Sequence, residues 1–231
     1  LGHRPVLPSV LGAADQAGKT EEGWIIGSGG GDNAMAALGL ETHVGDVVMS
    51  LGTSGTVFAV TSNPANDPTG TVAGFANAAG GFLPLVATLN ASRAIDSVRT
   101  LLGLSWEQFS ASVQMAAPGS GGLSLLPFFD GERMPNLPDA TGLLGGITRL
   151  NLTPENMARA VVEAVVSNLA HGLDAIVRET ETVTRLTLIG GGAQNVGVQQ
   201  VVSETVSLPV VVPDPGEYVA IGAAKQAAWA L

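Results

Sequence analysis

The sequence predicts an α/β fold in which a mixed β-sheet is covered by helices. Two patterns carry this prediction. In the first half of the chain, β-rich runs are joined by short turns, as in antiparallel strands. In the second half, helical and strand-like patterns alternate, as in folds with parallel strands. A chain of 231 residues can bury a sizeable core, in one large domain or in two small ones.

A first glycine-rich loop, Gly27–Asn33, follows the apolar residues Trp24 to Ile26 and precedes an apolar-periodic stretch at 34–38. Glycine allows a sharp turn and a close approach of the backbone to a ligand. Asp32 stands where the helix begins, so we expect it to cap the first turn in its ionised form. Such a carboxylate can accept a proton from a substrate hydroxyl, although an ordinary loop with an N-cap aspartate explains the same residues. A dinucleotide fingerprint fits poorly, because Asp32 occupies the turn and a hairpin pattern follows.

Two β-rich runs at 47–51 and 56–60 flank the turn Gly52–Gly55 and predict a hairpin. A third strand is expected near Phe82–Leu89. The glycines of the turn allow close approach, and its backbone N–H groups and two hydroxyls can donate to phosphate oxygens. A plain hairpin turn remains the alternative.

The middle of the chain predicts two helices, at 91–102 and 105–116. Ser105 has the side chain that an N-cap requires, so we expect it to begin the second helix. A short apolar run at 123–129 then predicts a strand.

The loop Asp130–Pro135 concentrates charge in a chain where charge is sparse. Such a cluster is usually solvated or paired within itself. We therefore expect a structural salt bridge inside this loop, and we leave Glu132 and Arg133 out of the candidate site.

The strongest helical pattern runs from Pro154 to Glu179. Thr153 suits the N-cap, and Pro154 suits the first helical position, where its missing N–H costs nothing. Apolar residues recur at steps of three and four, which predicts a helix buried in the core.

A continuous apolar run at 185–189 predicts a buried parallel strand after this helix. A second glycine loop, Gly190–Asn195, follows directly. The rest of the chain predicts a helix at 198–207, a strand at 210–212 and a closing helix at 218–230.

The composition argues against several classes of function. Acidic residues number 20 against 10 lysines and arginines, so the net charge of −10 argues against nucleic acid and anionic membranes as partners. No apolar run is expected to approach the roughly 20 residues that span a bilayer. Cysteine is absent, which excludes disulfides and thiolate chemistry, and His3, His43 and His171 lack the spacing of a metal site. Leu1–Pro5 lacks signal-peptide features, so we expect a cytoplasmic protein.

Three glycine-bearing turns thus follow apolar strands. Together they indicate a site that binds a nucleotide and transfers a phosphate. From about Gly12 to Leu231 the sequence resembles the C-terminal lobe of the FGGY carbohydrate kinases, which implies an actin-like ATPase (ribonuclease H-like) lobe. The motifs that carry the resemblance are Gly29–Ala34, Ser50–Gly55, Gly142–Ile147 with Asn156–Met157 and Ala160–Glu163, and Leu188–Asn195. The segments most similar to the xylulose kinases of this family are Gly29–Asn33, Gly131–Arg133, and Glu217–Tyr218 before Gly222–Ala224. Met134 departs from the threonine usual after the Glu-Arg pair.

The resemblance also implies a mechanism. Asp32 would be the catalytic base, taking the proton from the C5 hydroxyl of D-xylulose as that hydroxyl attacks the γ-phosphate of ATP, and Asn33 would help to bind the sugar. The residues expected to bind ATP are Gly52, Thr53 and Ser54 at the phosphates and Gly191, Gly192 and Asn195 around adenine. Mg²⁺ would accompany ATP.

The resemblance covers one lobe of a two-lobe enzyme. The N-terminal lobe of the family carries an Asp-x-Gly-Thr phosphate loop, a carboxylate that helps to hold Mg²⁺ and most sugar contacts, and no segment here matches it. We therefore expect residues 1–20 to be a lead-in from a missing N-terminal lobe and residues 21–231 to be the C-terminal ATP-binding lobe, with little or no kinase activity alone. Gluconate, glycerol, ribulose or fuculose as the substrate, a non-catalytic actin-like nucleotide-binding module, and a structural domain whose glycine loops are only turns remain alternatives. A homodimer also stays open, because these kinases are often dimers.

Overall fold

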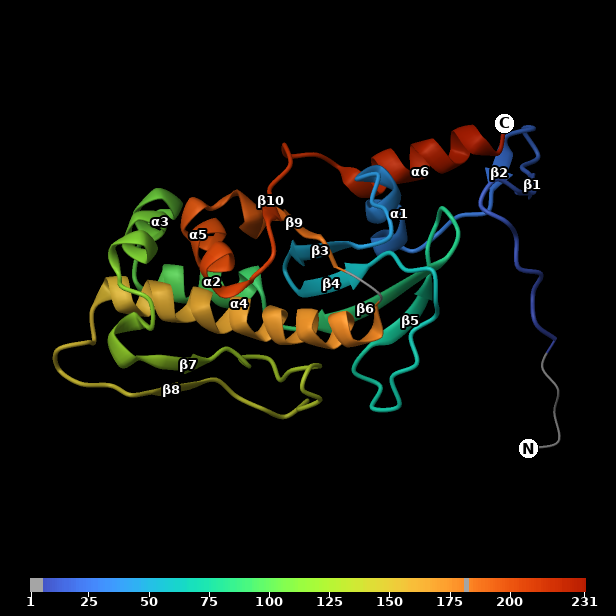
Figure 1. Ribbon diagram of the computed structural model, residues 1–231. Helices are drawn as coiled ribbons and strands as arrows, with labels where there is room; N and C mark the ends of the chain where they lie inside the picture. Colours follow the sequence, from blue (N-terminus) through green and yellow to red (C-terminus); the bar gives the residue numbers. More distant parts are fainter. Residues whose placement is uncertain (1–5, 181–182) are drawn as a thin grey trace. The chain divides into compact units, whose positions relative to one another are not determined.

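The computed structural model describes residues 6–180 and 183–231 and confirms a mixed α/β fold. His3 and the start of the predicted lead-in lie outside the described residues. The chain forms two compact units, whose elements can be followed by label and colour in Figure 1. Unit 1 comprises the described residues up to Thr42 with Ala76–Gly81 and Gly216–Leu231, and unit 2 comprises His43–Phe75 and Phe82–Pro215.

Unit 2 is built on a six-stranded sheet with the strand order β10-β9-β3-β4-β6-β5. β4 pairs antiparallel with both β3 and β6, whereas β9 runs parallel to β3 and to β10. The predicted hairpin, third strand and parallel strand are therefore confirmed. The strands are β3 (Asp46–Leu51), β4 (Gly55–Ala59), β5 (Ala73–Ala76), β6 (Phe82–Thr88), β9 (Arg185–Ile189) and β10 (Val210–Val211).

Three of the four α-helices described in unit 2 follow a residue whose side chain caps the first turn, and one follows Ala91, which has no capping side chain. Ser105 accepts a hydrogen bond from the Gln108 backbone N–H at 3.2 Å, and the Gln108 side chain accepts one from Ser105 N–H at 2.9 Å, which completes a capping box. The Thr153 side chain caps the long helix by accepting a hydrogen bond from the Asn156 backbone N–H at 3.3 Å, and Pro154 is the first residue of this helix, as predicted. The helices are α2 (Ser92–Leu101), α3 (Trp106–Met115), α4 (Pro154–Glu179) and α5 (Val196–Thr205).

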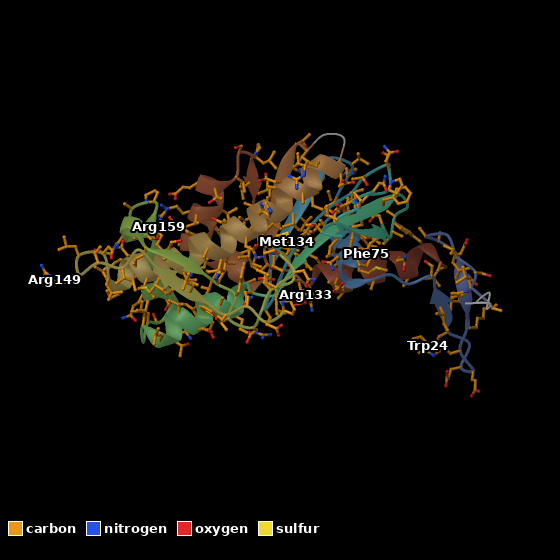
Figure 2. All side chains as sticks on the ribbon, turned by 90° about the horizontal axis from the view of Figure 1, so that it is seen from below. Trp24, Phe75, Arg133, Met134, Arg149 and Arg159 are labelled. Carbon is orange, nitrogen blue, oxygen red and sulfur yellow. The ribbon has the colours of Figure 1, made fainter. Side chains whose placement is uncertain are left out.

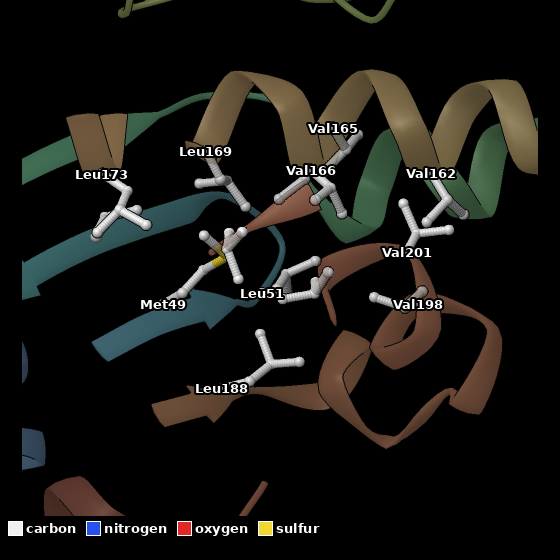
Figure 3. Packing of buried hydrophobic residues seen from close by; sticks show 14 of the residues in the cluster. Met49, Leu51, Val162, Val165, Val166, Leu169, Leu173, Leu188, Val198 and Val201 are labelled. Carbon is white, nitrogen blue, oxygen red and sulfur yellow. The ribbon is translucent and has the colours of Figure 1, made fainter. Parts of the chain in front are cut away.

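The core of unit 2 lies between α4 and the sheet. Figure 3 shows side chains of α4 pointing towards those of β3, β9 and α5. The buried residues labelled there are Met49, Leu51, Val162, Val165, Val166, Leu169, Leu173, Leu188, Val198 and Val201. Burial of this apolar surface is the main stabilising contribution to the unit.

The length and apolar composition of α4 would suffice to cross a membrane, contrary to the expectation from the sequence. However, 56% of the most apolar window of this helix is buried inside the structure. Its apolar residues are thus accounted for by contacts with the sheet and α5.

A small two-stranded sheet packs beside α4. β7 (Ser124–Leu126) is the predicted strand in shortened form, and it pairs antiparallel with β8 (Leu143–Gly145), which was not predicted. β8 lies inside the motif Gly142–Ile147. Gly146 has a φ of 72°, and a Cβ atom there would lie 2.1 Å from the Gly122 carbonyl oxygen. This part of the motif is therefore required for a close backbone contact.

Unit 1 is organised by two helices that approach each other closely. α1 (Asp32–Gly39) packs against α6 (Tyr218–Trp229), the predicted closing helix. A Cβ atom on Gly222 would lie 1.9 Å from the Met35 carbonyl oxygen, so only glycine fits at this contact. Two short antiparallel strands, β1 (Gln16–Lys19) and β2 (Ile25–Gly27), belong to the same unit, and β1 was not predicted.

A buried arginine joins three helices of unit 2. Arg159 of α4 is 1% exposed and donates to Glu163 at 2.7 Å, to Glu204 of α5, and to the carbonyl oxygens of Val113 and Ala116 at the end of α3. Burial by itself would lower the pKa of Arg159, but hydrogen bonds to the two carboxylates outweigh that effect and raise it. The guanidinium therefore stays charged and holds α3, α4 and α5 together.

We expect Arg159→Ala to lower the free energy of unfolding by about 3 kcal/mol, because two carboxylates lose their cation and two buried carbonyls lose its hydrogen bonds. Chemical denaturation followed by circular dichroism measures this loss. Arg149→Ala is the matched control, because Arg149 is exposed (Figure 2), and it should change stability by less than about 0.5 kcal/mol. Equal losses in the two variants would contradict the role of Arg159.

Candidate functional site

Two glycine loops leave the same edge of the sheet in unit 2. β3 and β9 are parallel, with Ser50 opposite Ile189, so the turns that follow them start side by side. Gly190 has a φ of 94°, and a Cβ atom there would lie 2.6 Å from the Leu51 carbonyl oxygen. Glycine is thus required for the second loop to pass directly over the end of β3.

The start of α2 is tied to the same edge. Ser92 donates from its backbone N–H to the Gly52 carbonyl and from its hydroxyl to the Leu51 carbonyl, both at 3.1 Å. A Cβ atom on Gly192 would lie 2.6 Å from the Ser92 hydroxyl oxygen. Three segments that are far apart in the sequence therefore meet here without room for larger residues.

A pocket of about 1090 Å³ opens where these segments meet. Five of the six residues predicted to bind ATP line it, and Ser54 does not. The five are Gly52, Thr53, Gly191, Gly192 and Asn195. The predicted phosphate turn and the predicted adenine loop thus contribute to one cavity, and Thr53 is an exposed residue of its lining.

Asn195 has a structural role in addition to its place in the pocket. Its side-chain oxygen accepts hydrogen bonds from the backbone N–H groups of Gly197 at 2.9 Å and Val198 at 3.2 Å. This N-cap starts α5 at Val196, two residues earlier than predicted. Because the side-chain oxygen serves the cap, the side-chain NH₂ is the group of Asn195 that can donate to a bound base.

The walls of the pocket come from α2 and α3, which sequence reasoning did not assign to the site. The polar and aromatic residues of these helices follow no motif spacing that indicates a binding site. Trp106, an aromatic residue that the structure shows half exposed, is the one sequence feature that could have pointed to this wall of the pocket. The lining residues from these helices are Ser92, Arg93, Ile95, Asp96, Trp106, Glu107, Ser110, Ala111 and Gln114.

Charged groups on these walls already have partners. Arg93 pairs with Asp130 at 3.1 Å, and both side chains are about half exposed. Asp96 pairs with Arg99 at 2.8 Å. Glu107 accepts hydrogen bonds from its own backbone N–H and from the Ser105 hydroxyl, which lowers its pKa. The walls of the pocket therefore offer no unpaired arginine to a phosphate within the described residues.

Glu132 does not take part in the salt bridge that we expected within its own loop. It is 2% exposed and accepts hydrogen bonds from the backbone N–H groups of Leu89, Asn90 and Arg133 and from the side-chain amides of Asn90 and Asn168. Arg133 is exposed (Figure 2), and the ion pair of the loop runs instead from Asp130 to α2. Glu132 thus fixes the connection between β6 and α2, and with it the start of α2.

Asp32 and Asn33 belong to unit 1, whereas the predicted ATP-binding residues belong to unit 2. The helix begins at Asp32 itself, and the N-cap residue is Gly31, so the expectation that Asp32 caps this helix is wrong. The exposed Asp32 carboxylate accepts hydrogen bonds from the backbone N–H of Asn33 at 2.8 Å and from its side-chain NH₂ at 3.0 Å.

Packing within unit 1 sets the position of this carboxylate. Besides the contact at Gly222, a Cβ atom on Gly39 would lie 2.0 Å from the Tyr218 carbonyl oxygen. Lys225 of α6 donates to Glu41 at 2.6 Å and to carbonyl groups at the end of α1, where a cation is favourable. The motif around Tyr218 and Gly222 therefore holds the helix that carries Asp32.

Among the described residues, no group of three or more histidine, aspartate or glutamate side chains is arranged to hold a metal ion.

Comparison with known proteins identifies relatives of the chain. The model of the FGGY family of carbohydrate kinases, C-terminal domain, matches residues 47–231. The chain is 45% identical to a xylulose kinase of Streptomyces rubiginosus, over 100% of this chain and 49% of the relative. It is 29% identical to a gluconokinase of Bacillus subtilis, over 96% of this chain and 43% of the relative. The crystal structure of xylulose kinase from Bifidobacterium adolescentis superposes with a TM-score of 0.85 at 44% identity, over 97% of this chain and 46% of that one. The chain spans about half the length of the curated relatives it matches.

The glycines of the second loop provide a matched pair of variants. Gly190→Ala should lower the free energy of unfolding by about 2 kcal/mol or more, because it combines a left-handed φ with a clash against the backbone of Leu51. Gly191→Ala should leave stability within about 1 kcal/mol, because a Cβ atom there meets nothing within 4 Å. Thermal and chemical denaturation measure both, and a harmless Gly190→Ala would contradict the close contact.

Glu132 and Arg133 provide a second pair. Glu132→Ala should cost about 3 kcal/mol of folding free energy, because several buried N–H groups lose their acceptor together. Arg133→Ala should stay within about 0.5 kcal/mol, because its side chain is exposed. Urea denaturation of both variants tests this difference, and a salt bridge between the two residues would instead predict similar losses.

Proposed function

The chain belongs to the FGGY family of carbohydrate kinases, and from this membership we propose that it supplies the ATP-binding lobe and the catalytic base of an enzyme that phosphorylates D-xylulose to D-xylulose 5-phosphate. The observation that carries the proposal is the pocket of unit 2, in which both glycine loops of the family motifs take part. The other lobe of the enzyme would complete the site. The absence of cysteine is compatible with a cytoplasmic location for this reaction.

ATP fits the chemistry of the pocket in two respects. The turn after β3 offers backbone N–H groups and the Thr53 hydroxyl to phosphate oxygens, and Ser54 lies next to it in the exposed part of the turn. The loop after β9 offers the open surface of Gly191 to a flat base, with Gly192 beside it in the pocket lining and the side-chain NH₂ of Asn195 as a donor. Phosphoryl transfer depends on such positioning and charge stabilisation more than on covalent chemistry.

In the proposed reaction, the sugar hydroxyl oxygen forms a bond to the γ-phosphorus of ATP while the bond from that phosphorus to the β–γ bridging oxygen breaks. The hydroxyl proton passes to the Asp32 carboxylate, and ADP leaves with the bridging oxygen. Asn33, which already donates to Asp32, would hold the carboxylate in place and bind the sugar. Mg²⁺ bound to the phosphates would neutralise the charge that develops there.

The substrate is proposed to be D-xylulose because the similarity to a xylulose kinase exceeds that to a gluconokinase, 45% against 29% identity. Gluconate is therefore the second candidate. Steady-state turnover of the two-lobe enzyme with xylulose, gluconate, glycerol, ribulose and fuculose identifies which of these sugars is the substrate. A non-catalytic nucleotide-binding module has no use for Asp32, and the retained carboxylate supports an enzyme.

We expect Asp32→Asn to reduce kcat by about 10²- to 10⁴-fold in the two-lobe enzyme, because the amide cannot accept the hydroxyl proton. The affinity for ATP should remain unchanged, because the predicted nucleotide residues belong to unit 2. Steady-state kinetics with xylulose and calorimetry with MgATP measure the two effects. The chain of 231 residues alone should bind ATP weakly and show little or no turnover.

Gly191→Ala is the complementary control. Its methyl group would stand in open space at the pocket, so ATP affinity should fall while the fold and Asp32 stay intact. Normal turnover in Asp32→Asn would assign the base elsewhere. Failure of ATP to bind either the chain or the two-lobe enzyme would refute the nucleotide function.

A further inference from the structure

Trp106 is a large aromatic side chain that stands half exposed on the wall of the pocket. It is the first residue of α3 and is 45% exposed. The other two tryptophans of the chain, Trp24 and Trp229, belong to unit 1. A single exposed indole is common on protein surfaces. This one requires more explanation, because it lines the same cavity as the loops at Gly52 and Gly191.

Two neighbouring side chains, Arg99 and Phe109, contact the Trp106 ring and restrict its orientation. The guanidinium carbon of Arg99 lies 4.8 Å from the centre of the ring, a cation–π distance. Arg99 is itself held by hydrogen bonds to Asp96 at 2.8 Å and to the Leu104 carbonyl at 2.6 Å. Phe109, which is fully buried, meets the indole edge to face at 6.0 Å and 79°.

The backbone at Trp106 is equally constrained. The capping box formed by Ser105 and Gln108 defines the first turn of α3, in which Trp106 is the first residue. The ring is thus held by a cation, an aromatic contact and a capped helix, while the residue is 45% exposed and lines the pocket. Such preorganisation lowers the entropic cost of binding a flat ligand.

From this arrangement we propose that Trp106, held by Arg99, is the stacking surface for the purine base of the nucleotide. This inference rests on the proposed function and adds to it a residue that determines base specificity. An aromatic face attracts any flat base, and the larger π-surface of a purine gains more from stacking than a pyrimidine does. The base would then lie between Trp106 and the loop at Gly191, with its phosphates directed to Gly52 and Thr53.

The test uses tryptophan fluorescence of the 231-residue chain in which Trp24 and Trp229 are replaced by phenylalanine, so that Trp106 is the one indole. MgATP should quench this fluorescence with the same dissociation constant that calorimetry gives for the chain with all three tryptophans. Inorganic tripolyphosphate with magnesium should leave the fluorescence unchanged, because it has no base. CTP should quench less and bind more weakly than ATP.

Variants separate stacking from folding. In the chain with its other tryptophans, Trp106→Ala should raise the dissociation constant for ATP on the order of tenfold, whereas Trp106→Phe should retain most of the affinity. Trp24→Ala is the control, an equally simple truncation of an exposed indole in unit 1, and should bind ATP normally. Far-ultraviolet circular dichroism checks that each variant is folded.

The outcomes distinguish this inference from the function on which it rests. ATP binding by calorimetry without quenching of Trp106, or unchanged affinity in folded Trp106→Ala, would overturn the stacking role and leave the kinase proposal intact. Absence of ATP binding to the unaltered chain and to the two-lobe enzyme would overturn both.

Discussion

The parallel pairing of β3 with β9 is the constraint on which the pocket depends. Because the two strands run in the same direction, their following loops leave one edge of the sheet, where α/β folds commonly bind ligands. Gly190 turns that proximity into contact, since its missing side chain lets the second loop cross the end of β3. The pocket is therefore a consequence of strand direction and of one small residue, and the chemistry of its lining is added by the loops.

The rigidity of this edge comes from the core beneath it. Gly55, at the start of β4, would bring a Cβ atom within 2.7 Å of both Leu169 of α4 and Thr88 of β6, so the turn before it rests directly on packed residues. Glu132 fixes the start of α2 through amide groups, and Arg159 joins α3, α4 and α5. These buried charges lie outside the pocket lining, and each holds a wall of the pocket through a helix or loop that it contacts.

The sequence predicts best what depends on local chemistry. α4 and its bounds follow from Thr153, Pro154 and the spacing of apolar residues, and the hairpin follows from β-rich runs around a glycine turn. β8 could not be predicted, because three residues carry no period and the strand exists through the approach of Gly146 to Gly122. Glu132 was misjudged because its partners are amides from distant segments, which a count of charges in the loop cannot reveal.

The candidate base depends on residues at the opposite end of the sequence. Asp32 lies at the start of α1. Gly39 of α1 and Gly222 of α6 make the close contacts between these two helices, and α6 lies near the C-terminal end of the chain. Unit 1 is thus assembled from both ends of the described chain, whereas every lining residue of the nucleotide pocket belongs to unit 2. The two halves of the proposed chemistry are therefore supported by separate cores. Substitutions that loosen the packing of α6 on α1 should therefore displace the Asp32 carboxylate without altering the nucleotide pocket. The role of the motif around Gly222 is to hold the helix that follows the glycine loop and carries Asp32.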